Sequence, residues 1–314
     1  MQRCFDLAFK SQGYTYPNPL VGCVIVRGQK IISEGWHKKA GEDHAEVIAI
    51  KKVKEKKELK KSTLYVNLEP CCHKGKTPPC TELIIKSGIQ NVVIGCLDPN
   101  INVNGKGVKE LIKNGINVLV GVCMEKAMEL NKRFFCFHEK KRPYIILKWA
   151  ETDDGIISPK HKNNNRPYWI SNDVSRQYVH KWRSQEHAIL VGSKTVDFDN
   201  PQLNSRNWDN NNPIKIVIGN PKIKSKDTLY IHNGNDLNIK NITNFLHKKN
   251  IQSVLVEGGN KTLKTFIENN LWDEARVFKS TNKLKKGVLA PKINGTKFYE
   301  ENIKDDNLKI IRNH

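Results

Sequence analysis

The residues best suited to chemistry in this sequence lie between His44 and Cys80. A His-Ala-Glu triplet begins at His44, and Cys71 and Cys80 are separated by eight residues. One imidazole and two thiolates provide three ligands for tetrahedral zinc and leave the fourth position for water, as in a catalytic site. Zinc lowers the pKa of bound water from about 16 to about 7, so that hydroxide is available at neutral pH. Glu46 can then carry a proton from this water to a leaving amine.

The alternative is a structural zinc site, which needs a fourth protein ligand. Cys72 and His73 are close enough in the sequence to be considered for that role. A closed site would leave Glu46 without a structural function, so the pattern favours the catalytic site. A histidine, a nearby glutamate and two cysteines are also the zinc-site residues of deaminases that act on amino-pyrimidine and amino-purine rings.

Length and composition favour two globular domains. A chain of 314 residues is too long for one ordinary core and suits two domains of about 150 residues. Its 38% hydrophobic content is enough to bury real cores, yet no run approaches the roughly 18–20 apolar residues of a membrane span. The N-terminus shows no secretory signal pattern. Apart from the two candidate ligands, the cysteines stand mostly singly in apolar surroundings, so we expect a reduced, cytoplasmic protein.

The formal net charge of +21 allows two interpretations. It can indicate nucleic-acid binding, or it can reflect a lysine-rich composition that implies no partner. Lysines are spread along the whole chain, and their densest run, residues 51–61, includes glutamates at helical spacing, which is typical of a solvated helix face. We therefore expect no nucleic-acid partner, although positive potential would also favour a phosphorylated substrate.

Strand and helix patterns alternate around the candidate zinc ligands. Helical spacing marks residues 3–10 and 108–114. Strands are predicted over residues 21–27, 30–34, 63–68, 92–96 and 118–122. His44 and Glu46 are expected in the first turn of one helix, and Pro70 at the favoured first position of another. This order predicts an α/β domain with the metal at one end of the sheet.

A basic stretch, residues 132–142, separates the two halves of the chain, and a new strand is predicted over residues 144–149. We place the boundary near residue 144, which gives domains 1–144 and 145–314. In the second half, an apolar strand leads into Gly258-Gly259 and a helix. Such a turn can bind phosphate through backbone N–H groups. It lacks the full dinucleotide fingerprint, so a plain strand–turn–helix connection fits equally well.

The long Cys71–Cys80 spacing, the triplet at His44 and the upstream segment 17–23 together resemble the deaminase domain of the bifunctional deaminase–reductase family of riboflavin biosynthesis. In the second half, the segments 147–155, 169–171, 183–192 and 253–259 resemble the reductase domain of the same family. The resemblance therefore extends to about residue 293. It implies a cytidine-deaminase-like three-layer α/β domain followed by a dihydrofolate-reductase-like domain. It also implies one zinc ion per chain and NADPH as hydride donor.

The resemblance implies roles for individual residues. In the deaminase half, Asn18 and His37 would hold the base and Lys76 would contact the phosphate. In the reductase half, Lys148 and Asp199 would be the polar catalytic groups around the ribose. Its implied substrate-binding residues are Pro167, Arg183, Leu203, Arg206 and Glu257. Its implied cofactor-binding residues are Glu151, Trp169, Thr195, Asp199, Asn220, Gly259, Asn260, Lys261 and Thr262. Glu151, Pro167 and Gly219-Asn220 depart from the residue types usual in the family.

A two-step enzyme follows from this resemblance. The first half would deaminate 2,5-diamino-6-(5-phosphoribosylamino)pyrimidin-4(3H)-one, and the second would reduce the ribosyl group to a ribityl chain. The alternatives are a chain in which only the deaminase half is active, a nucleoside or RNA deaminase with an appended basic domain, and a zinc-stabilised interaction module. The long cysteine spacing disfavours the RNA deaminase, and Glu46 disfavours the interaction module. We expect a small phosphoribosyl-pyrimidine substrate, no membrane partner and no nucleic acid, and leave homo-oligomer formation open.

Overall fold

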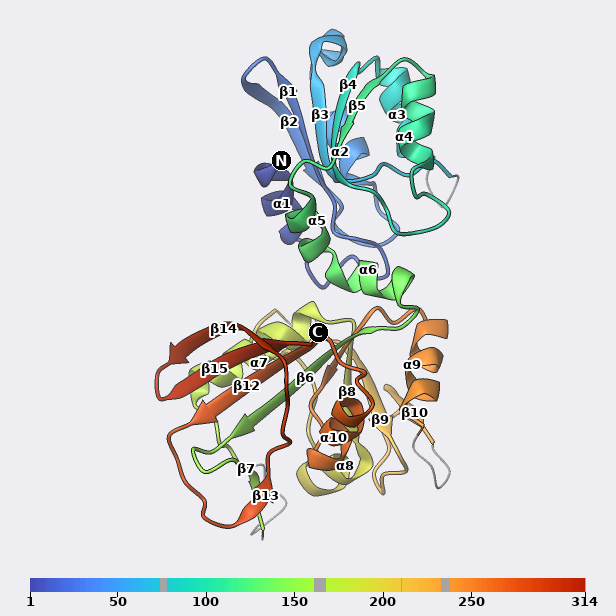
Figure 1. The fold of residues 1–314 in the computed structure, drawn as a ribbon. Helices are drawn as coiled ribbons and strands as arrows, with labels where there is room; N and C mark the ends of the chain where they lie inside the picture. The colour runs from blue at the N-terminus through green and yellow to red at the C-terminus, as the bar shows by residue number, and fades with distance from the viewer. Residues whose placement is uncertain (74–77, 161–167, 210, 233–237, 314) are drawn as a thin grey trace. The chain divides into compact units, whose positions relative to one another are not determined.

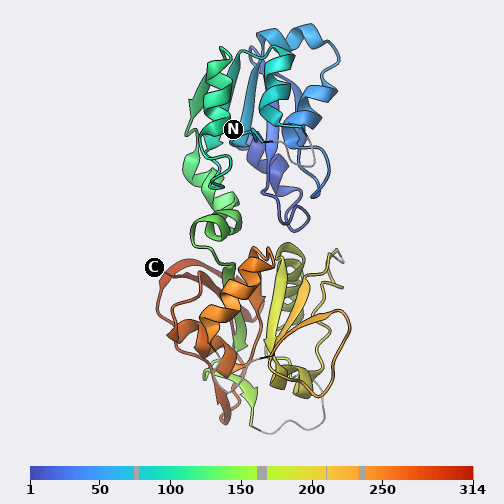
Figure 2. The same cartoon turned by 90° about the vertical axis from the view of Figure 1, so that its right-hand side faces the viewer.

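The computed structural model describes residues 1–73, 78–160, 168–209, 211–232 and 238–313. The chain divides into two compact units, Met1–Lys140 and Lys141–His314, and each is described by itself (Figure 1, Figure 2). The division precedes strand β6 (Tyr144–Glu151).

The N-terminal unit is built on a five-stranded sheet with the order β2-β1-β3-β4-β5. Its strands are β1 (Gly22–Arg27), β2 (Lys30–Trp36), β3 (Thr63–Leu68), β4 (Asn91–Cys96) and β5 (Asn117–Val120). Strand β1 pairs antiparallel with β2 and β3, whereas β3, β4 and β5 run parallel. The strands predicted over residues 21–27 and 30–34 are confirmed and pair as a hairpin, in whose turn Gly28 adopts a positive φ of 58°.

Helices cover both faces of this sheet and give three layers (Figure 1). They are α1 (Gln2–Phe9), α2 (Ala45–Lys52), the 3-10 helix η1 (Lys56–Lys61), α3 (Cys80–Ser87), α4 (Lys106–Lys113), α5 (Met124–Leu130) and α6 (Lys132–Glu139). Side chains alternate across β1. Cys23 and Ile25 pack with Ala49 of α2, while Val24 packs with Leu7 of α1.

Two local predictions in this unit are wrong. Pro70 does not begin a helix; the helix that follows β3 begins only at Cys80. The two consecutive prolines before Cys80 explain the delay, because a residue that precedes proline disfavours the helical conformation. The strand expected to continue to residue 122 ends at Val120, and Gly121 follows with φ of 97°.

The C-terminal unit contains an eight-stranded sheet with the order β10-β9-β8-β11-β6-β12-β15-β14. Besides β6, its strands are β8 (Ala188–Gly192), β9 (Ile214–Ile218), β10 (Thr228–Ile231), β11 (Ser253–Val256), β12 (Glu274–Ser280), β14 (Thr296–Ile303) and β15 (Asp306–Arg312). The strands from β10 to β12 run parallel, and β15 and β14 continue the sheet antiparallel. A separate ribbon pairs β7 (Ile156–Pro159) with β13 (Gly287–Leu289). The residues that follow β8, β9 and β11 therefore gather at one edge.

The helices of this unit are α7 (Asp173–Gln185), α8 (Ser193–Asp199), α9 (Ile239–Lys248) and α10 (Asn260–Glu268). Leu190 of β8 belongs to a buried cluster with Leu246 of α9 and Phe266 of α10. Trp182 of α7 stacks on Phe278 of β12 at 5.4 Å between ring centroids. Helix α8 has no fully buried residue, and its partly buried Val196 packs against the cluster of Ile189, Val191, Leu203 and Val217.

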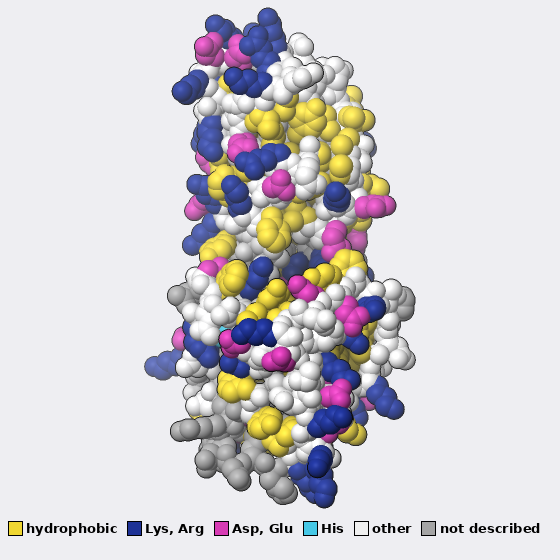
Figure 3. Space-filling view, turned by 90° about the vertical axis from the view of Figure 1, so that its left-hand side faces the viewer, with side chains coloured by type: hydrophobic (Ala, Val, Ile, Leu, Met, Phe, Trp, Pro, Cys, Tyr) yellow, Lys and Arg dark blue, Asp and Glu magenta, His cyan; other side chains and the backbone are white. Residues whose placement is uncertain are grey.

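The surface offers no membrane-spanning element in the part of the chain that the structure describes, since none of the helices there is long and apolar enough to cross a bilayer. On the face drawn in Figure 3, lysine and arginine side chains are distributed among acidic ones over each unit, and hydrophobic side chains gather over part of the N-terminal unit. The basic residues on this face thus form no continuous field of one sign.

Candidate active sites

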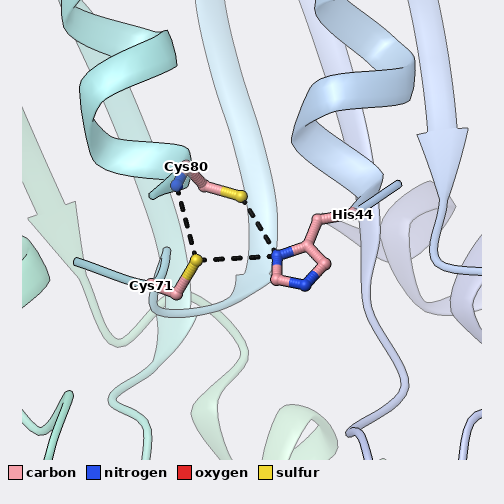
Figure 4. Close-up of side chains that lie close together, drawn as sticks. All are labelled: His44, Cys71 and Cys80. Atoms are coloured by element: carbon pink, nitrogen blue, oxygen red, sulfur yellow. Dashed lines mark hydrogen bonds between the residues drawn. The ribbon is translucent and has the colours of Figure 1, made fainter. Parts of the chain in front are cut away.

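His44, Cys71 and Cys80 come together at one end of the N-terminal sheet (Figure 4). His44 is the residue immediately before α2, Cys80 is the first residue of α3, and Cys71 lies in the loop after β3. Their candidate ligand atoms all lie within 4.8 Å of one another. The Nδ1 atom of His44 is 3.3 Å from the Sγ of Cys80 and 3.5 Å from that of Cys71.

These separations suit a tetrahedral metal ion. With Zn–S bonds of about 2.3 Å and Zn–N bonds of about 2.0 Å, tetrahedral ligand atoms lie roughly 3.5–3.8 Å apart. Among the described residues the cluster has three members and includes neither Cys72 nor His73. The Sγ of Cys72 is instead 3.9 Å from the backbone oxygen of Asn102. The donor atoms thus fit zinc with one position left for another ligand.

Contacts within the cluster, together with burial, shift the pKa values of its residues and of the neighbouring Glu46. A hydrogen bond from Cys80 and the proximity of His44 lower the pKa of Cys71 to about 4, although burial opposes this shift. The contact with Cys71, together with burial, raises the pKa of Cys80 well above its usual range. Burial, reinforced by the charge of Cys71, raises the pKa of Glu46 to about 7. Glu46 is only 3% exposed, so this carboxyl group is shielded from water and can exist in either protonation state near neutral pH.

Two local features position the metal ligands. At Gly35, a Cβ atom would lie 2.6 Å from the backbone oxygen of Ala45, so only glycine lets β2 approach α2 this closely. Glu69 precedes the Cys71 loop and is buried. Its carboxylate accepts hydrogen bonds from the backbone N–H groups of Gly105, Asp98 and Val108. Sequence reasoning missed Glu69; an acidic residue between an apolar strand and Pro-Cys is the signal that would have found it.

The two residues expected to hold the base lie beside the cluster. The Nδ2 of Asn18 is 3.0 Å from the Nε2 of His37, and the Nδ1 of His37 is 3.2 Å from the backbone oxygen of Asp43. A carbonyl oxygen only accepts, so Nδ1 carries the proton and Nε2 accepts from Asn18. Burial lowers the pKa of His37. The rings of His37 and His44 are 5.4 Å apart. Lys76, expected at the phosphate, lies outside the described residues.

A second polar cluster forms in the C-terminal unit from three residues on different elements. Arg183 of α7 donates from Nε and Nη2 to the two carboxylate oxygens of Glu257, at 2.8 Å each. The Nζ of Lys148 on β6 is 3.9 Å from the same carboxylate. Burial acts to raise the pKa of Glu257, but the charges of Arg183 and Lys148 outweigh it and lower this pKa to about 2. Burial lowers the pKa of Lys148 despite the attraction of Glu257.

Of the other residues expected at this site, Asp199 lies at the end of α8, and Leu203 and Arg206 lie on the segment that follows it. Leu203 is buried and has a φ of 52°, and Arg206 is exposed. The Nη1 of Arg206 donates to the side chain of Asn204 at 2.8 Å. Pro167 lies outside the described residues. The structure therefore joins Lys148, Arg183 and Glu257 directly, while the role of Asp199 stays a prediction.

Several expected cofactor residues meet where β8, β9 and β11 end. Cβ atoms at Gly192 and Gly258 would lie 2.9 Å and 2.6 Å from side-chain atoms of Thr262, and one at Gly259 would lie 4.0 Å from the Oγ1 of Thr195. The Nδ2 of Asn260 donates to the backbone oxygen of Leu289, whereas its buried Oδ1 has no hydrogen-bond partner among the described residues.

The remaining expected cofactor residues lie near the glycines that follow β8, β9 and β11, or on other elements. Asn220 follows Gly219, whose φ of 99° and close approach to Ser193 require glycine. Lys261 is exposed on α10. Glu151 accepts a hydrogen bond from the indole of Trp149 at 2.7 Å, and Trp169 is 58% exposed. A backbone cradle with an unpaired amide oxygen fits a phosphate- and amide-bearing cofactor such as a nicotinamide dinucleotide.

Comparison with known families identifies both units. Residues 1–96 match the family model of the cytidine and deoxycytidylate deaminase zinc-binding region. Residues 143–280 match that of the RibD C-terminal domain. The fold and the two clusters thus define a class of enzyme in which a zinc-binding deaminase domain precedes a reductase domain.

Individual relatives align over nearly the whole chain. The riboflavin biosynthesis protein RibD of Aquifex aeolicus is 39% identical over 94% of this chain and 87% of its own length. A solved structure of a diaminohydroxyphosphoribosylaminopyrimidine deaminase/5-amino-6-(5-phosphoribosylamino)uracil reductase from Thermotoga maritima superposes with a TM-score of 0.90, at 34% identity, over 100% of this chain and 97% of that one. A structure of Acinetobacter baumannii RibD gives 0.89, at 29% identity, over 99% and 97%.

The chain belongs to the RibD family of bifunctional riboflavin biosynthesis enzymes, with deaminase and reductase activities. This confirms the expected fold class, a cytidine-deaminase-like domain followed by a dihydrofolate-reductase-like domain. It also confirms the expected combination of deamination and reduction in riboflavin biosynthesis. The RNA deaminase and the interaction module are thereby set aside.

Proposed function

We propose that the N-terminal unit binds one zinc ion through His44, Cys71 and Cys80 and deaminates 2,5-diamino-6-(5-phosphoribosylamino)pyrimidin-4(3H)-one. The C-terminal unit then reduces the ribosyl group of the product to a ribityl chain with NADPH. The observation that carries the proposal is the convergence of the three ligands within 4.8 Å beside the buried Glu46. The name of the Thermotoga maritima relative, which covers both reactions, supports the choice of substrates.

In the deaminase site, each residue has a defined task. Zinc, when bound, supplies a Lewis acid that makes water acidic enough to deprotonate at neutral pH. Glu46, with its pKa of about 7, accepts a proton on a carboxylate oxygen and returns it to the departing amine. The amide of Asn18 and the neutral ring of His37 hold the base beside the metal ligands, and Lys76 meets the phosphate.

In the reductase site, the nicotinamide of NADPH, when bound, supplies the hydride. Lys148 and Asp199 would supply the proton that the ribose ring oxygen takes up when its bond to the anomeric carbon breaks, and burial lowers the pKa of Lys148, which makes its ammonium group a better proton donor. Glu257 holds Lys148 and Arg183 in place, and Pro167 and Leu203 shape the substrate site. Arg183 and Arg206 bind the phosphate through guanidinium N–H groups. The proposed cofactor contacts are Glu151, Trp169, Thr195, Asp199, Asn220, Gly259, Asn260, Lys261 and Thr262.

The two units would work as separate domains, 1–144 and 145–314. The diffusible product of the first is the substrate of the second, so neither reaction requires a macromolecular partner. We propose a cytoplasmic enzyme, because the cysteines outside the metal site stand mostly singly in apolar surroundings, and we propose no nucleic-acid partner, because the lysines are spread along the whole chain.

The test follows ammonia release and NADPH absorbance in the same assay, with the phosphoribosyl diaminopyrimidinone as substrate. We expect ammonia release without NADPH, and NADPH oxidation only when substrate is present. Supplying the deaminated compound directly separates the two halves. If the wild-type protein then oxidises no NADPH, the reductase proposal fails and only the deaminase half is active; if it releases no ammonia from the first substrate, the deaminase proposal fails.

A further inference from the structure

Asn204 occupies a fixed position in the loop between α8 and β9. On one side, Leu203 is buried against Ile189, Val191 and Val217, and its φ of 52° turns the chain. A left-handed conformation is unfavourable for a residue with a side chain, so the surrounding packing must hold this turn.

On the other side of Asn204, Ser205 is fully buried. Its N–H donates to the side chain of Asn212 at 2.9 Å, and its hydroxyl donates to the backbone oxygen of Asn211 at 3.0 Å. Asn204 therefore lies between two anchored residues.

The backbone oxygen of Asn204 is held by two side chains of α7. The Nδ1 of His180 is 2.9 Å from this oxygen, and the Nη1 of Arg183 donates to it at 3.1 Å. The two residues are three positions apart, so they lie on the same face of the helix. Because a carbonyl oxygen only accepts, His180 must carry its proton on Nδ1. His180 is 5% exposed, which leaves its ring little freedom to move away.

The side chain of Asn204 contacts the second arginine. Its Oδ1 accepts from the Nη1 of Arg206 at 2.8 Å, and its Nδ2 donates to the side chain of Gln202 at 3.3 Å. The two oxygens of this one residue thus bind Arg183 and Arg206. Both arginines are the proposed phosphate ligands, and Asn204 sets the distance between them.

Arg183 and Arg206 differ in the negative charge that lies beside their guanidinium groups. Arg183 uses two N–H groups on Glu257 and one on Asn204, which leaves two of the five that a guanidinium offers. Arg206 forms no ion pair within the described part of the chain, and its single hydrogen bond there goes to a neutral amide. Glu257 therefore faces two cations, Arg183 and Lys148, while Arg206 has no carboxylate partner among the described residues, and a phosphate group would supply the missing negative charge.

We propose that Asn204 is a positioning residue of the reductase site, which spaces Arg183 and Arg206 for one phosphate group, and that His180 fixes its backbone oxygen. This inference rests on the proposed reductase function, and it adds the two residues that arrange the phosphate ligands. Neither residue touches the reacting atoms, so both should affect recognition of the phosphate rather than hydride transfer.

The first test compares kcat/KM for the deaminated phosphoribosyl substrate with that for its dephosphorylated counterpart. Removing one hydrogen bond to a charged group should lower the preference of Asn204→Ala for the phosphorylated compound about tenfold. The value for the dephosphorylated compound should stay unchanged. Asn207→Ala is the matched control, because Asn207 is an exposed asparagine of the same loop whose side chain forms no hydrogen bond among the described residues. An equal loss with both compounds, or an unchanged preference, would overturn the proposal.

The second test asks whether the N–H group that His180 offers to the backbone oxygen of Asn204 is needed. In His180→Asn the amide N–H can replace the Nδ1 proton and should keep most of the phosphate preference, whereas His180→Leu should lose it. If the leucine variant does not fold, Asn204→Ala decides alone.

Binding of ribose 5-phosphate, measured by calorimetry, separates this proposal from the proposed function. Asn204→Ala should bind it about tenfold more weakly than wild type. If the wild-type protein oxidises no NADPH, the proposed function fails, and the binding comparison still judges Asn204.

Discussion

At the residue scale, the types and spacing of His44, Cys71 and Cys80 predicted a zinc site, which needs the three side chains in one place. The sequence separates His44 from Cys71 and Cys80, and the structure brings their ligand atoms within 4.8 Å. The residue types carried this prediction, because one histidine and two cysteines with a nearby glutamate match the residues of a catalytic zinc site in deaminases. The supporting contacts could not be predicted in the same way. Glu69 binds backbone N–H groups and Asn204 offers a backbone oxygen, and the partners of such contacts cannot be identified from residue types in a sequence.

Glu46 should be separable from the metal ligands by mutation. We expect Glu46→Gln to retain zinc and to lose deamination by a factor of about 10² or more, because it removes the proton carrier and no ligand. Cys80→Ser should instead release zinc. Metal content by atomic absorption and ammonia release by enzyme assay check both variants. Glu46→Gln that deaminates at the wild-type rate would sink the assignment.

Glu69 should affect the metal site through the backbone that it holds. Glu69→Ala leaves the buried N–H group of Asp98 and the partly buried ones of Gly105 and Val108 without their acceptor, which should cost about 3 kcal/mol. Chemical unfolding and zinc release to a chelator measure the effect. Glu125→Ala, at an exposed site, is the control. The same stability in both variants would contradict an anchoring role.

Glu257 should make the C-terminal unit sensitive to acid. Its folded-state pKa of about 2 lies below the ordinary value of 4.5, so its ionised form stabilises the fold above pH 4.5. That stabilisation, roughly 3 kcal/mol, is lost as the pH falls from 4.5 toward 2. Glu257→Gln should therefore be less stable than wild type at pH 7, with the difference shrinking below pH 4.5. Urea unfolding at several pH values checks this; a difference that stays constant down to pH 3 would contradict it.

At the element scale, hydrophobic patterns predicted the five strands of the N-terminal unit and the helices α1, α2 and α4, and the errors there have local causes. The strands expected over residues 21–27 and 30–34 pair as a hairpin because a glycine turn separates them. No helix begins at Pro70, since residues 70–73 are not helical, and the next helix among the described residues begins at Cys80, directly after Pro78 and Pro79. Contacts between distant elements, such as Arg183 with Glu257, depend on sheet order, which periodicity does not provide.

The approach of α2 to β2 should depend on Gly35. A methyl group there would meet the backbone oxygen of Ala45 and the backbone nitrogen of Ala49 at 2.6 and 2.7 Å, so α2 and its zinc ligand would have to move. We expect Gly35→Ala to cost about 1–3 kcal/mol and to weaken zinc retention. Gly41→Ala is the comparison, because its Cβ has open space and only the φ of 90° opposes it. Calorimetry with a chelator titration measures both; zinc bound as tightly by Gly35→Ala as by Gly41→Ala would refute the argument.

At the scale of the whole molecule, each unit has its own core and its own site. The buried cluster around Ile25 and Val66 belongs to the N-terminal unit, and the cluster around Leu147 and Val256 belongs to the C-terminal one. Each proposed reaction can therefore be assigned to residues of one unit. The sequence indicated this organisation through the basic stretch 132–142 and the change of motifs after it, but not the strand order within either sheet.

Independent folding is the prediction that this organisation supports. A fragment ending at residue 144 keeps all five strands of the first sheet together with His44, Glu46, Cys71 and Cys80. We expect it to be monodisperse, to retain zinc and to release ammonia without NADPH, because a domain with its own core can fold alone. The fragment 145–314 retains the eight-stranded sheet except for the first residue of β6, Tyr144. It should oxidise NADPH with the deaminated substrate and should not act on the phosphoribosyl diaminopyrimidinone. Size-exclusion chromatography, zinc content and the two assays check the pair. If neither fragment is folded while the full chain is active, the two halves share stabilising contacts and the boundary is wrong.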